Sequence, residues 1–161
     1  MLNGRIDAMI RPPMSESNPI NITVETRFGR QTASSGSKWE PKMGYSRAVR
    51  SGNTIAVTGT VGVNSDGKYP KTVGEQAQRS LDIILAAIKA LGGKPEHVIR
   101  TRMFVTDISQ WEAVAAVHGK VFGEIRPATS ILEVPRLIDG DALIEIEADA
   151  IIGETVKSFG E

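Results

Sequence analysis

The chain has 161 residues, 40% apolar and 24% charged, which suits one domain with its own hydrophobic core. Nineteen basic and nineteen acidic residues cancel, so no net positive field favours nucleic acid or a membrane surface. The absence of cysteine excludes disulfides and thiolate chemistry, and two histidines are too few for an all-histidine metal site. With no run of 18 apolar residues and no signal-peptide core, a cytoplasmic protein is expected. A bound metal is not expected either.

The first 43 residues are expected to lie outside the main domain. Residues 1 to about 20 have weak periodicity and three prolines, which indicates a loose arm. The polar, Gly/Ser-rich stretch from Thr32 to Gly44 indicates a loop. The predicted organisation is therefore an arm and loop over 1–43 and a single domain over 44–161.

Two strands and a helix are expected next. The strands lie between Ser46 and Val63, around a tight turn at Gly52-Asn53, because Gly and Asn tolerate positive φ. Thr72 and Glu75 have the spacing of a capping box, and a helix of about 20 residues ends at Gly92-Gly93. Its apolar residues recur at three- and four-residue steps: Val73, Ala77, Leu81, Ile84, Leu85, Ile88 and Leu91.

The second half of the chain predicts a strand from His97 to Ile108 and then another helix. That helix is expected to start near Ser109, with Ser109 and Glu112 as its cap. Its expected apolar stripe is Trp111, Val114, Ala115, His118 and Phe122. Two further strands follow, one in ATSILEVPRL and one in DALIEIEADAII. The order strand, strand, helix, strand, helix, strand, strand predicts an α+β fold, with two helices packed on one face of a sheet.

The last strand carries a row of carboxylates, because Glu145, Glu147 and Asp149 alternate with apolar residues and share one face. One interpretation is a solvent-facing surface, with Arg100 and Arg102 on a neighbouring strand opposing the acids. The other is that this face is buried against a second subunit. Glu145 then acts as a general base or orients water, because burial raises the pKa of a carboxylate.

Other candidate chemistry is weaker. His118 lies on the apolar stripe of a helix, which favours a hydrogen-bonded, partly buried histidine over a catalytic one. The glycines do not form a phosphate-binding loop, since no glycine-rich motif follows a strand and opens a helix. Asp139 and Asp141 flank a glycine and are explained by turn chemistry. No Ser/His/Asp set is indicated.

These segments together resemble the RidA family, also called the YjgF or L-PSP endoribonuclease family. The resemblance lies in Tyr45, SGNTIAVTG, EQAQRSLDIILAAIKALGG, RTRMFVTDI, RPATSILEV and IEIEADAI, in family order with almost no gaps. It implies a chorismate-mutase-like fold with a mixed sheet. It also implies a homotrimer in which three sheets meet in a barrel-like assembly and small-molecule clefts lie between subunits.

The resemblance further implies hydrolysis of 2-imino acids and their enamine tautomers without a cofactor. The family's catalytic glutamate corresponds to Glu145, and its substrate-binding tyrosine and glycine correspond to Tyr45 and Gly59. The substrate-binding strand segment corresponds to Thr129, Ser130 and Ile131. Threonine at 129 is a departure, because relatives hold the substrate carboxylate there with a bidentate arginine. Arg126 lies three residues earlier, which predicts that it points to the other face of an extended segment.

Three hypotheses follow for this divergent subfamily member. The first is an imine or enamine hydrolase that is inefficient on 2-aminoacrylate, with Thr129 and Ser130 orienting the substrate. The second is a trimeric protein that binds a small molecule without turnover. The third and weakest is an endoribonuclease or translation inhibitor, because the net charge is zero and no acid–base histidine pair is present.

Overall fold

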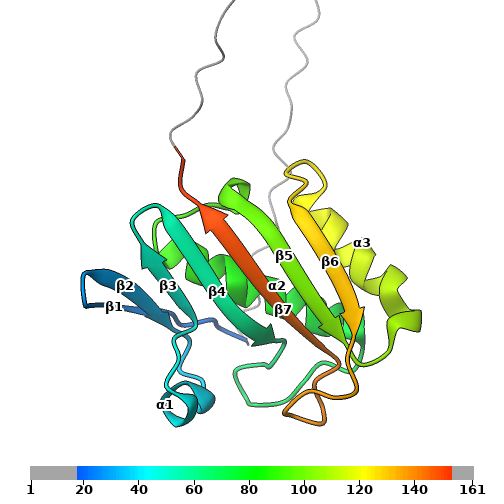
Figure 1. Cartoon of the computed structure of the whole chain (residues 1–161). Helices are drawn as coiled ribbons and strands as arrows, with labels where there is room; N and C mark the ends of the chain where they lie inside the picture. Colours follow the sequence, from blue (N-terminus) through cyan, green and yellow to red (C-terminus); the bar gives the residue numbers. More distant parts are fainter. Residues whose placement is uncertain (1–17, 154–161) are drawn as a thin grey trace, which may run out of the picture.

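The computed structural model describes residues 18–153, which form one mixed sheet, two longer helices and one short helix (Figure 1). The strands are β1 Thr23–Arg27, β2 Arg30–Ser34, β3 Ala48–Ser51, β4 Thr54–Val61, β5 Val98–Val105, β6 Ala128–Glu133 and β7 Ile144–Ile151. The helices are α1 Trp39–Met43, α2 Val73–Ala90 and α3 Trp111–Phe122, with 3₁₀ turns at Pro95–His97 and Ile108–Gln110. None of the helices in this part of the chain is long and apolar enough to cross a membrane.

The sheet has seven strands in the order β1-β2-β3-β4-β7-β5-β6. Every neighbouring pair is antiparallel except β5 and β6, which are parallel. Both α2 and α3 lie behind the sheet in Figure 1, so the other face is free of helices over its centre. The predicted α+β fold, with a mixed sheet and two helices on one face, is confirmed.

Helix α2 forms as its sequence predicts. The Thr72 hydroxyl accepts a hydrogen bond from the amide of Glu75 at 3.3 Å, and the Glu75 carboxylate accepts one from the amide of Thr72 at 3.1 Å. All seven residues of the predicted stripe are buried against the sheet. Gly92, in the left-handed region at φ +83°, follows the end of the helix. Burial of this stripe between helix and sheet forms the centre of the hydrophobic core.

Helix α3 departs from its prediction at its start and along its exposed side. The predicted Ser109 cap is wrong, because Asp107 accepts from the Ser109 amide and caps a 3₁₀ turn instead. The stripe is also narrower than predicted. Val114 and Phe122 are buried, whereas Trp111 is 51% exposed and Ala115 is exposed.

The region before residue 44 differs most from its prediction. The expected loop over 32–44 contains the end of β2 and the short helix α1. A hairpin of β1 and β2 also extends the sheet, since β2 pairs with β3 through Thr32 and Val49. The sheet therefore continues across the predicted boundary between an arm and a domain. Of the predicted arm, residues 1–17 lie outside the described residues.

Candidate active-site cavity

The acidic row on β7 divides into two parts. The Arg102 guanidinium makes ion pairs with Glu147 at 2.8 Å and with Asp149 at 3.1 Å, on the face of the sheet without helices. An arginine on the neighbouring strand β5 therefore opposes these two acids, although Arg102 makes both pairs and Arg100 makes neither. Glu145 has no ion-pair partner among the described residues, and it lies at the edge of a cavity.

Glu145 sits directly over Gly59 because of an irregularity in β4. The register between β4 and β7 shifts between Val57 and Thr60, so Thr58 and Gly59 occupy the place of one residue. A Cβ atom on Gly59 would lie 1.9 Å from Oε1 of Glu145. Glycine at 59 therefore leaves the space that the Glu145 carboxylate occupies.

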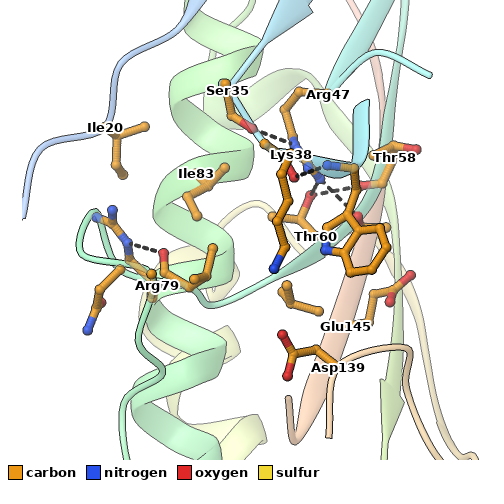
Figure 2. A pocket seen from close by; sticks show the side chains of 18 of the residues that line it. Ile20, Ser35, Lys38, Arg47, Thr58, Thr60, Arg79, Ile83, Asp139 and Glu145 are labelled. Carbon is orange, nitrogen blue, oxygen red and sulfur yellow. Dashed lines mark hydrogen bonds between the residues drawn. The ribbon is translucent and has the colours of Figure 1, made fainter. Parts of the chain in front are cut away.

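The cavity has a volume of about 680 Å³ and is lined by residues of β4 and β7 and by Arg79 and Ile83 of α2. Tyr45, Gly59 and Glu145 all line it, so three of the residues predicted for the site come together. Residues from the N-terminal side of the chain complete its walls, including Ile20, Lys38 and Trp39. Figure 2 shows Glu145 and Asp139 on one side of the cavity and Ile20 and Ile83 on the other.

A buried arginine forms the upper wall of this cavity, and sequence reasoning missed it. The Arg47 guanidinium donates to the Gly59 carbonyl and the Thr60 hydroxyl, both at 2.9 Å, and to the Ser35 hydroxyl at 3.1 Å (Figure 2). Its charge is balanced by Glu40 at 3.8 Å, and both side chains are almost fully buried. Arg47 therefore fixes the backbone of Gly59, directly beneath the Glu145 carboxylate.

The electrostatics of the cavity raise the pKa values of two of its side chains, Glu145 and Tyr69. Burial and the neighbouring negative charge of Glu147 raise the pKa of Glu145, and Arg47 partly opposes this. The pKa of Tyr69 is raised to about 12, mainly by burial. The negative charge of Asp139 and a hydrogen bond with Asp139 raise it further. Tyr69 is thus a neutral phenol whose hydroxyl donates to the Asp139 carboxylate. Within residues 18–153, no cluster of three His, Asp or Glu residues is arranged to hold a metal ion.

Thr129, Ser130 and Ile131 do not line this cavity. Thr129 lies opposite Thr101 in the sheet and shares its face with α3. Its hydroxyl contacts the Thr101 hydroxyl and lies 3.3 Å from Nε2 of His118, which is itself 2.9 Å from Oγ1 of Thr101. Ser130 has the opposite orientation, and Ile131 packs against the core. Within one chain, Thr129 and Glu145 therefore lie on opposite faces of the sheet.

The predictions for His118 and Arg126 have different outcomes. His118 is partly buried and hydrogen-bonded, as predicted, and burial lowers the pKa of its imidazole. The orientation of Arg126 was predicted by assuming an extended segment, and that assumption is wrong because Arg126 has φ +56°. Its amide instead donates to the Phe122 carbonyl at 2.7 Å and closes the end of α3.

The fold and the cavity define a class of α+β protein with a carboxylate-containing site on the open face of its sheet. The family model described as endoribonuclease L-PSP matches residues 36–152. The chain belongs to this family, the RidA/YjgF family.

Relatives in several organisms support the assignment. The 2-iminobutanoate/2-iminopropanoate deaminase of Escherichia coli is 38% identical over 111 residues, which cover 66% of this chain and 86% of the relative. The RutC family protein UK114 of Drosophila melanogaster is 33% identical over 126 residues, covering 77% and 91%. The crystal structure of a YjgF/YER057c/UK114 family member from Mycobacterium tuberculosis is 44% identical with a TM-score of 0.72, and covers 76% of this chain and 99% of that one.

Proposed function

We propose that this protein hydrolyses an imine or enamine of a small metabolite, with Glu145 as the general base. The observation that carries the proposal is the position of the Glu145 carboxylate. It lies over Gly59 at the edge of a large cavity, has no ion-pair partner among the described residues, and has a raised pKa. A carboxylate in this environment exchanges a proton closer to neutral pH than an exposed one. The name of the E. coli relative supports the same reaction class.

In the proposed reaction, water adds to the carbon of the protonated imine while the Glu145 carboxylate accepts one of the water protons. The product of this step is a neutral carbinolamine. Glu145 then returns the proton to the nitrogen and the carbon–nitrogen bond breaks. As the carbonyl forms, the hydroxyl proton passes to the departing ammonia, which leaves as ammonium. Tyr45 lines the cavity and can donate a hydrogen bond to the substrate, whereas the hydroxyl of Tyr69, which also lines it, donates to Asp139. The cycle consumes one water and returns Glu145 to its starting state.

The same proposal expects little turnover of 2-aminoacrylate. Thr129 carries no charge, and its hydroxyl is occupied by Thr101 and His118 on the helix side of the sheet. We further propose that the protein is a homotrimer and that a neighbouring subunit completes the cleft. Support for this comes from the family and from the open face of the sheet. Ser130, which faces the open side of the sheet, then contributes to the cleft from the edge strand β6.

The test is hydrolysis of 2-imino acids generated in situ by an amino-acid oxidase, with semicarbazide as the competing trap. We expect the wild type to accelerate loss of imines with longer side chains and to act weakly on 2-aminoacrylate, whereas Glu145→Gln is inactive. Rapid hydrolysis that is equal in wild type and Glu145→Gln contradicts the proposal.

A protein that binds a ligand without turnover is the second candidate, and the uncharged Thr129 favours it. This alternative predicts that keto acids bind the wild type and Glu145→Gln with equal affinity and that neither variant consumes any imine. The hydrolase proposal predicts imine consumption that depends on Glu145. The two are therefore separated by the same pair of proteins.

A further inference from the structure

Three cations line the cavity, and two of them are already engaged. Arg47 is buried against Glu40 and donates to the backbone and hydroxyl groups around Gly59. Arg79 donates to the carbonyls of Val63 at 3.1 Å and Asn18 at 3.0 Å. Neither guanidinium is free to move toward a ligand without breaking these contacts.

Lys38 differs from both arginines. No carboxylate among residues 18–153 lies within ion-pairing distance of its ammonium. Its contact is with the Trp39 ring, whose centroid is 5.3 Å from Nζ. In Figure 2 the Lys38 side chain extends into the cavity, between Arg79 and the acids Glu145 and Asp139. The cavity therefore contains an ammonium group that can form an ion pair with an anionic ligand.

The opposite wall carries the complementary charge. Asp139, Glu145 and Glu147 line it, and a protonated imine placed there gains from their negative potential. A volume of about 680 Å³ is in the range of cavities that hold ligands much larger than a three-carbon acid. Apolar side chains of Ile20 and Ile83 line the same space and accept a hydrocarbon segment (Figure 2).

We propose that Lys38 binds a carboxylate of the ligand, several bonds away from the imine carbon that lies at Glu145. The substrate class is then an imine or enamine with an apolar spacer and a distant carboxylate. This inference rests on the proposed function for the position of the reacting carbon. It assigns the anion-binding role to a lysine before α1, and Thr129 has no part in it.

The test measures binding of 5-oxohexanoate, a ketone with a distant carboxylate, and of its neutral amide to the full chain by calorimetry. We expect the wild type to bind the acid about tenfold more tightly than the amide, because a charge-assisted hydrogen bond is lost in the amide. Lys38→Gln should weaken binding of the acid about tenfold and leave binding of the amide unchanged. Lys42→Gln is the matched control, because Lys42 lies over the same Trp39 ring at 5.2 Å but does not line the cavity.

Equal affinity of the acid for wild type and Lys38→Gln overturns the inference, and so does equal loss in Lys38→Gln and Lys42→Gln. Failure of the wild type to prefer the acid over the amide also overturns it. Binding is measured without turnover, so the two proposals fail separately. A Lys38-dependent affinity without any imine hydrolysis rejects the hydrolase and keeps the anion site. Hydrolysis that depends on Glu145, together with binding that does not depend on Lys38, keeps the hydrolase and rejects the anion site.

Discussion

At the scale of single residues, the contact between Gly59 and Glu145 decides what the cavity can do. The backbone of Gly59 is not in the left-handed region, so alanine fits its conformation. The nearest atoms to an added Cβ all belong to the Glu145 side chain, which is flexible at its end. A methyl group there moves the carboxylate and leaves the sheet in place.

Gly59→Ala is therefore expected to reduce kcat for imine hydrolysis at least tenfold while the melting temperature changes little. The reason is displacement of the general base from its position, with no loss of core packing. Steady-state kinetics and thermal unfolding together check this. Gly119→Ala is the control, since a Cβ at this exposed helical position meets nothing within 4 Å. An active Gly59→Ala enzyme contradicts the assigned position of the base.

The raised pKa of Glu145 also predicts a gain in stability when the charge is removed. Between the unfolded pKa of about 4.3 and the higher folded pKa, the native state binds more protons than the unfolded state. The free energy of unfolding therefore falls as pH rises through this window, and the penalty is complete above it. Glu145→Gln should unfold at a higher temperature than the wild type at pH 8 and at nearly the same temperature at pH 4. If Glu145→Gln is stabilised equally at pH 4 and pH 8, the stabilisation does not come from removing the charge of Glu145.

At the scale of helices and strands, the sequence predicts an element correctly when its capping residues and its apolar pattern agree with how it packs in the fold. Helix α2 has a capping box, a continuous apolar stripe and a terminal glycine, and all three features appear in the structure. The β1–β2 hairpin has no such signal, because TVETR is exposed along its whole length and RQTAS buries only Ala33. Its pairing with β3 is a tertiary effect that alternation of apolar residues does not reveal.

The candidate site could be predicted only in part, because some of its residues are brought together by tertiary packing that no local sequence pattern shows. Gly59 and Glu145 come from the adjacent strands β4 and β7, Tyr45 comes from the segment between α1 and β3, and all three meet in one cavity. Lys38 and Ile20 reach the same cavity from the segments directly before α1 and β1, and no local pattern marks them. Thr129 is separated from Glu145 by the register of β5 with β6 and β7, which places it on the helix face.

The segment that carries Ile20 is held by Arg79 of α2. The guanidinium donates to the carbonyls of Asn18 and Pro19, and the Asn18 side chain bonds to Asn64 at 2.7 Å. Arg79→Gln is expected to speed hydrogen exchange at residues 20–22 and to weaken ligand binding severalfold, because one cavity wall loosens. The expected loss of global stability is only about 1 kcal/mol. Lys89→Gln on the same helix is the charge-matched control. Equal rates of hydrogen exchange at residues 20–22 in both variants would contradict the role of Arg79 in holding this segment.

At the scale of the whole molecule, one face of the sheet and both of its edge strands, β1 and β6, are left open. Nearly all residues of the edge strand β6 are exposed. Leu132 is 49% exposed and lies opposite Phe104 on the face that carries the acids. An exposed edge strand with an apolar residue next to an uncovered face is typical of a surface that binds another subunit.

The trimer proposal predicts a mass in solution of about 52 kDa, three times the chain mass of 17.3 kDa. Light scattering after size-exclusion chromatography measures it. Leu132→Asp should shift the population toward monomer, because it places a charge in the proposed interface. Phe28→Asp, at the 95% exposed tip of the β1–β2 hairpin, should remain a trimer. A monomeric wild type rejects the proposal.

The most direct measurement of the central claim is the pH dependence of kcat/KM for hydrolysis of a 2-imino acid that the enzyme accepts. A general base must be deprotonated, so the rate falls as pH falls through its pKa. Because burial and Glu147 raise the pKa of Glu145, the acidic limb is predicted to lie above the ordinary glutamate value of about 4.3. Glu147→Gln should move this limb to lower pH, because it removes a neighbouring negative charge. An acidic limb that is unchanged in Glu147→Gln and persists in Glu145→Gln would contradict the account.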